Sequence, residues 1–212
     1  MCSNFSLTSY KLRSNFTHSN QDVQDELRKE IFEVIGNDKQ PSLSERINMP
    51  YTEATILEIQ RQAVIGKYYI WVNDQKYVMS LYAGPDGVMR VNKTPLNAGP
   101  YTIPSGHALL PSLSEIMMGE DSWTNAKKFD PTRFLEDGKF KRDERVIPFQ
   151  IGKRVCPGEG LAKAELFLFL VGLIQKFKFE PETPGTIVDY TMIPGFTWVP
   201  HRHDRIKVTR IV

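Results

Sequence analysis

The sequence lacks several features that would place it outside ordinary globular proteins. It has only two cysteines, Cys2 and Cys156, and their wide separation argues against a disulfide framework. The longest apolar stretch, Leu166 to Ile174, is interrupted by Gly172 and suits a buried helix better than a membrane span. The formal net charge is only +2 over 212 residues, so nothing points to a nucleic-acid partner. We expect the polar residues 1–20 to be a disordered lead-in and not a signal peptide.

What the chain does contain is one cysteine in an unusual setting, within Phe149 to Gly158. Cys156 comes just before a long apolar helix, and a helix N-terminus together with a nearby cation favours a thiolate. Such a thiolate is one of the few protein groups that hold a haem iron. Gly152 and Gly158 leave room for the backbone to approach a flat macrocycle. A free structural cysteine is the alternative, and the fixed positions of the motif taken together argue against it.

These ten residues match F-x-x-G-x-R-x-C-x-G and resemble the haem-ligand loop of the cytochrome P-450 family. The resemblance implies that Cys156 is the axial ligand of the iron in haem b, with Phe149 shielding its sulfur. It also implies that Arg154 pairs with one haem propionate, which a guanidinium suits well. Arg90, in the segment Val88-Met89-Arg90, resembles the basic residue that contacts the second propionate.

Two further segments strengthen the resemblance. Glu58 and Arg61 are spaced to share one face of a helix, and Arg133 lies in Pro131-Thr132-Arg133-Phe134. They resemble the E-x-x-R and P-x-R-F segments of the family and stand in the same order, ahead of the cysteine. The resemblance implies that Glu58, Arg61 and Arg133 form a buried structural triad, tolerable because each charge is paired. Trp123 is interpreted as a packing residue.

Periodicity predicts four helices, at about residues 22–35, 51–62, 112–118 and 159–178. Gly36 is expected to end the first, and Thr52 is expected to cap the second. The fourth is apolar nearly all round, so we expect it to be buried on most sides. Short strands are expected at residues 88–94, 101–103, 196–199 and 206–212. The fold class is therefore mainly α with small β-sheets, the C-terminal, haem-proximal part of the cytochrome P-450 fold, over residues 21–212.

The chain also departs from the family pattern. We expect it to lack the N-terminal half, including the membrane anchor, and the oxygen-activating central helix, so no catalytic residue is assigned. Residues 66–87 stand where the family has only a short Pro-containing link. They are either untranslated sequence retained in a gene model or a true surface hairpin insertion.

The function implied by the resemblance is that of a haem-thiolate monooxygenase of the animal microsomal type. Such an enzyme adds one oxygen atom to a small, lipophilic organic substrate in the endoplasmic reticulum membrane. Its electrons come from NADPH through NADPH–cytochrome P-450 reductase. The alternative is a truncated, catalytically inactive fragment that at most binds haem or a redox partner.

Overall fold

The computed structural model describes residues 20–62, 69–72, 75–78, 90–109, 112–183, 192–193, 199–200 and 206–211. Four α-helices lie in these ranges: α2 (Gln21–Val34), α3 (Pro50–Gln62), α4 (Leu113–Met118) and α5 (Glu159–Lys176). Three 3-10 helices join them: η1 (Leu43–Asn48), η2 (Pro131–Phe134) and η3 (Gly152–Arg154). The four predicted helices are thus confirmed, with ends that differ by one or two residues.

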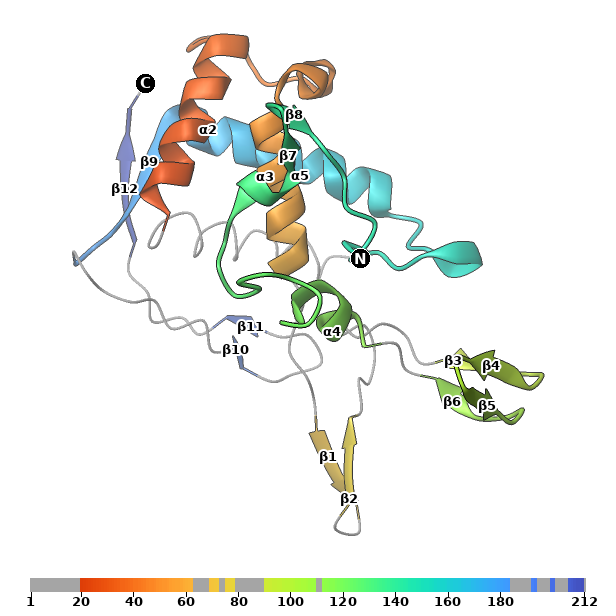
Figure 1. Ribbon diagram of the computed structural model, residues 1–212. Helices are drawn as coiled ribbons and strands as arrows, with labels where there is room; N and C mark the ends of the chain where they lie inside the picture. Colours follow the sequence, from red (N-terminus) through yellow and green to blue (C-terminus); the bar gives the residue numbers. More distant parts are fainter. Residues whose placement is uncertain are drawn as a thin grey trace.

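The strands are short and pair as antiparallel couples. They are β1 (Tyr69–Val72) with β2 (Gln75–Val78), β3 (Arg90–Val91) with β6 (Ala108–Leu109), β4 (Leu96–Ala98) with β5 (Tyr101–Ile103), β7 (Leu135–Glu136) with β8 (Lys139–Phe140), β9 (Phe177–Pro181) with β12 (Ile206–Arg210), and β10 (Met192–Ile193) with β11 (Val199–Pro200). The described part of the chain is therefore mainly helical with small sheets, as its sequence predicts (Figure 1).

Helix α2 forms because its apolar residues recur at helical spacing. Val23, Leu27 and Ile31 fall on one face and are all buried. The helix ends before Gly36, whose φ of +84° is the left-handed conformation that glycine adopts without penalty. Both features follow from the local sequence.

Helix α3 is the centre of the molecule and is buried almost along its whole length. One side, with Ile56 and Ile59, packs into a core shared with α2 and α5. Another side, with Ala54 and Leu57, packs into a second core with α4 and the segment around Phe134. Because α3 belongs to both cores, it fixes α5 and the segment 112–146 relative to each other (Figure 1).

The pair β9–β12 is joined to α2 by the side chain of Gln24, which pairs with the β9 backbone as a neighbouring strand would. The buried Gln24 amide donates to the Phe179 carbonyl oxygen at 3.0 Å and accepts from the Phe179 N–H at 3.0 Å. Gln21 donates to the same oxygen at 2.9 Å. These bonds satisfy backbone groups at the edge of β9 that would otherwise lose water without replacement.

Helix α5 differs from its prediction. Leu166, Phe167 and Leu170 are buried against α2 and α3, but Leu161 is 65% exposed and Phe169 is 51% exposed. The prediction that α5 is buried on most sides is therefore wrong for the described part of the chain. The reason is that α2 and α3 both pack on one side of α5, which leaves the opposite apolar side uncovered.

Strands β1 and β2 form a hairpin within the segment 66–87, and Figure 1 shows it projecting away from the helices. Residues 66–68, 73–74 and 79–87 of that segment lie outside the described residues, as does the predicted lead-in up to residue 19. The predicted strand at 196–199 is described only from Val199. No helix in the described ranges is both long enough and apolar enough to cross a membrane.

Candidate haem-ligand loop and its support

The cysteine loop is held closed by its own backbone. The Cys156 N–H donates to the Phe149 carbonyl oxygen at 3.0 Å, which joins the two ends of the loop. Between them η3 makes one tight turn, in which the Val155 N–H bonds to the Gly152 oxygen at 3.1 Å. The Glu159 N–H then bonds to the Cys156 oxygen at 3.3 Å, where α5 begins. Cys156 is a free, partly exposed cysteine at the start of a long helix.

The backbone conformation of this loop explains why residue 152 is a glycine. Gly152 has a φ of +80°, and a methyl group added there would meet no atom within 4 Å. The glycine is therefore required by conformation, and its open side is a place that a flat group can approach closely. Gln150 has a φ of +65°, a strained value for a residue with a Cβ atom. Gly158 has an ordinary φ of −91° and precedes α5 as its N-cap residue.

A cavity of about 300 Å³ opens beside this loop. Its walls come from α3, from the segment 142–152 and from the first turns of α5, and they include Leu57, Gln60, Phe149, Gly152, Val155 and Glu159. Phe149 itself is only 8% exposed, and its carbonyl oxygen accepts the bond from the Cys156 N–H.

Glu58 and Arg61 form a buried ion pair on α3, and both side chains have no exposed area. Arg61 Nε donates to Glu58 Oε2 at 2.7 Å, and Arg61 Nη2 donates to Glu58 Oε1 at 2.8 Å. Arg61 also donates to the carbonyl oxygens of Met117 at 3.0 Å and Ala126 at 2.7 Å. The bidentate pairing and the added acceptors offset the cost of burying two charges.

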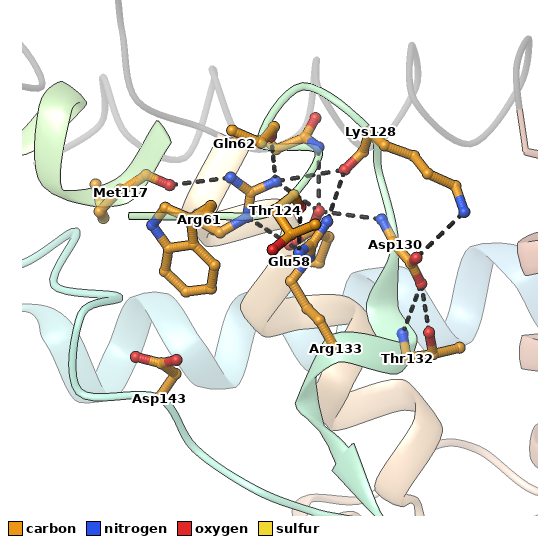
Figure 2. A network of polar contacts seen from close by, with 12 residues as sticks. Glu58, Arg61, Gln62, Met117, Thr124, Lys128, Asp130, Thr132, Arg133 and Asp143 are labelled. Atoms are coloured by element: carbon orange, nitrogen blue, oxygen red, sulfur yellow. Dashed lines mark hydrogen bonds and ion pairs between the residues drawn. The ribbon is translucent and has the colours of Figure 1, made fainter. Parts of the chain in front are cut away.

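Arg133 reaches the same carboxylate from η2, as Figure 2 shows. Its Nε lies 3.4 Å from Glu58 Oε2, close enough for an ion pair but without hydrogen-bond geometry. Its other nitrogens donate to the carbonyl oxygens of Thr124 at 3.3 Å and Lys128 at 3.2 Å. The structure therefore brings Glu58, Arg61 and Arg133 together, and the two arginines bind the loop 117–128 through its backbone.

Asp130 is part of this network, although sequence analysis did not single it out. Its backbone N–H donates to Glu58 Oε1 at 3.0 Å, and its carboxylate accepts from the Thr132 hydroxyl and from Lys128 (Figure 2). Burial acts to raise the pKa of Asp130, but the hydrogen bonds from Thr132 and Lys128 outweigh it and lower the pKa. The Asp-Pro pair at residues 130–131 is the local signal, because Asp is a frequent cap before a proline at the first helical position.

The other predicted site residues are described only in part. Arg154 lies in η3 and Arg90 lies in β3, but their side chains are outside the described residues. In the described ranges, no group of His, Cys, Asp and Glu side chains has the arrangement of a metal site.

Comparison with known proteins agrees with this geometry. The family model "Cytochrome P-450" matches residues 16–68 and 81–204, which is most of the chain. This protein therefore belongs to the cytochrome P-450 family. Cytochrome P-450 2U1 of Homo sapiens is 40% identical over 183 residues, covering 86% of this chain and 30% of the relative. Cytochrome P-450 2J1 of Oryctolagus cuniculus is 36% identical over 190 residues, covering 89% of this chain and 34% of the relative.

A fish relative gives the same result. Cytochrome P-450 2K4 of Oncorhynchus mykiss is 34% identical over 193 residues, covering 89% of this chain and 34% of the relative. Relatives from three vertebrates support the animal microsomal type predicted from the sequence. The chain spans about a third of the length of the curated relatives that it matches.

Proposed function

We propose that Cys156 is the axial thiolate ligand of the iron of haem b. The observation that carries this proposal is the closed loop from Phe149 to Cys156, with its left-handed Gly152, at the N-terminus of α5. The partial exposure of Cys156 and the open side of Gly152 both fit a flat, iron-bearing group. Phe149 would cover the sulfur, since low local polarity tunes a metal–thiolate bond. Gly152 and Gly158 would let the macrocycle approach, and Arg154 and Arg90 would bind its propionates.

The activity that fits this ligand is monooxygenation. We propose it for a full-length protein of the family, since this chain spans only about a third of the length of its relatives. A thiolate-bound haem, when present, supplies the activation of dioxygen and the transfer of one oxygen atom to a substrate. The residues of this chain would hold that group, with the Cys156 sulfur as the protein ligand. The triad Glu58, Arg61 and Arg133 would be structural, because its arginines hold the backbone of the segment 117–128.

We also propose a class of substrate and a redox partner. Small lipophilic organic compounds would be the substrates, and NADPH–cytochrome P-450 reductase at the endoplasmic reticulum membrane would supply electrons. Lys153 is exposed beside Cys156, and Arg142 is exposed at the nearby cavity. Two cations near the ligand loop would suit an acidic docking surface on the reductase.

The first experiment is spectroscopic. The chain is expressed with haem, reduced and exposed to carbon monoxide, and the Soret band is recorded. We expect the long-wavelength band of a thiolate-bound haem, and we expect Cys156→Ser to abolish it. Cys2→Ser is the matched control and should keep the band. A band that survives in C156S would overturn the assignment of the ligand. NADPH-dependent turnover with the reductase then tests the monooxygenase activity separately.

We further infer that residues 21–212 are part of the family domain and that residues 66–87, approximately, are an insert in it. The family match stops at residue 68 and resumes at residue 81, and β1 pairs with β2 within the gap. Retained untranslated sequence and a true hairpin insertion both fit this observation. Full-length transcript sequencing distinguishes them, because abundant messages that contain the segment would exclude the first.

A further inference from the structure

Trp123 lies between the charge triad and the segment that leads to Cys156. Its side chain is only 5% exposed. The indole Nε1 donates to the Ile116 carbonyl oxygen at 2.8 Å. The ring also meets Phe134 edge to face, with centroids 6.0 Å apart and an angle of 74° between the planes. These two contacts fix both the position and the tilt of the indole.

Three guanidinium groups surround this one ring. The Cζ atom of Arg145 lies 4.0 Å from the ring centroid, that of Arg61 lies 5.1 Å away and that of Arg133 lies 5.9 Å away. All three fall within the distance of about 6 Å at which a cation is attracted to an aromatic ring. Two of these arginines belong to the triad, whereas Arg145 belongs to the segment just before the cysteine loop.

Arg145 is itself held firmly. Its Nε donates to Asp143 Oδ1 at 2.9 Å, and its Nη2 donates to Asp143 Oδ2 at 2.6 Å. Its Nη1 donates to the carbonyl oxygen of Ser122, the neighbour of Trp123. The hydrogen bonds from Arg145 outweigh burial and lower the pKa of Asp143, so this carboxylate stays charged at neutral pH. The pair Asp143–Arg145 is thus tied to the loop that carries the indole.

The same segment continues directly into the cysteine loop. Val146, the residue after Arg145, is 1% exposed and packs in the same core as Trp123. Phe149 follows three residues later, and its carbonyl oxygen accepts the bond from the Cys156 N–H at 3.0 Å. A shift of Arg145 would therefore be passed along a short, packed stretch of backbone to Cys156.

We propose that Trp123 is a positioning residue for the cysteine loop. Its ring joins the arginines of the triad to Arg145, so that α3 and the segment 143–149 keep one relative placement. The proposal rests on the proposed function and deepens it, since it concerns the position of Cys156, the proposed iron ligand. In this role Trp123 must offer an aromatic face to the arginines. An aliphatic side chain of similar volume would not replace it.

The test is amide hydrogen exchange on the full chain without haem. Trp123→Leu removes the aromatic face and Arg145→Gln removes the cation, and each should raise exchange in residues 143–156 about tenfold. Trp123→Phe keeps a ring and should stay within about threefold of the wild type in that segment. The control is Ile31→Val, which loosens the other core. It should not raise exchange in residues 143–156 above exchange in the rest of the chain. If W123L and W123F behave alike, or if W123L raises exchange evenly along the chain, Trp123 only fills the core.

A second measurement uses the haem-loaded chain. With carbon monoxide, W123L should convert part of the thiolate-type Soret band into the band of a protonated or displaced thiol, and W123F should not. An intact band in W123L, with unchanged exchange, would overturn the positioning role. If the wild type itself shows no thiolate-type band, the haem assignment fails, and the exchange data still decide the role of Trp123.

Discussion

At the scale of single residues, the shape of the cysteine loop depends on the backbone conformation of its residues. Gly152 and Gly160 both have open space where a methyl group would go, but only Gly152 has a positive φ. Any effect of adding a methyl group at these positions therefore comes from the backbone, since no neighbour is touched. The two glycines therefore make a matched pair, because an added methyl group is crowded at neither position.

We expect Gly152→Ala to lower the free energy of unfolding by about 1 kcal/mol, because an L-residue is strained in the left-handed region. Gly160→Ala, in the first turn of α5, should leave stability unchanged or raise it by up to about 1 kcal/mol. Urea denaturation of both variants checks the prediction. Equal losses in the two variants would mean that space, and not conformation, limits these positions.

At the scale of elements, α3 begins with a cap that comes from another helix. The helix starts at Pro50, a residue that suits the first helical position, so Thr52 is not the N-cap and that prediction is wrong. Glu30 of α2 instead accepts from the N–H groups of Tyr51 and Thr52, both at 2.8 Å, and from the Thr52 hydroxyl at 2.6 Å. A carboxylate there satisfies free N–H groups and interacts favourably with the helix dipole.

Glu30→Ala should therefore lower the free energy of unfolding by about 2 kcal/mol, since it leaves helix N–H groups without a charged acceptor. Glu33→Ala, an exposed position on the same helix, is the control and should change stability by less than about 0.5 kcal/mol. Thermal or urea unfolding measures both. A loss in E30A no larger than in E33A would show that the cap is dispensable.

At the scale of the whole molecule, α2, α3 and η2 bring four carboxylates near one phenol. Burial is the largest of the effects that raise the pKa of Tyr51 to about 12, and the charges of Asp22, Glu26, Asp130 and Glu30 supply the rest. The ordinary value is 10.0, so the unfolded chain ionises this phenol first. The contribution of Tyr51 is fully present below pH 10 and is lost as the pH rises towards 12.

We therefore expect the wild type to lose about 1 kcal/mol more stability than Tyr51→Phe between pH 10 and pH 12, after allowance for solvent screening. Urea denaturation of the two proteins across this range is the measurement, and other alkaline groups cancel because both proteins share them. Parallel stability curves would contradict the raised pKa.

Most of the helices could be predicted from the sequence, because each depends on residues close together in the chain. The spacing of Val23, Leu27 and Ile31 and the position of Gly36 fix α2 without help from elsewhere. The face shared by Glu58 and Arg61 follows in the same way from an i, i+3 spacing. The order of the motifs around Cys156 likewise predicts the family from the sequence alone.

Tertiary structure alone decided which distant groups meet these local elements. Glu30 at the start of α3, the Asp130 N–H on Glu58 and the three arginines around Trp123 join segments far apart in sequence. It also left one side of α5 exposed although its composition predicted burial, since burial depends on which neighbours a helix has. The sequence by itself determined the helices, the cysteine motif and the family, because these are local patterns. The fold determined what holds that motif in place, because packing and ion pairing act across the chain.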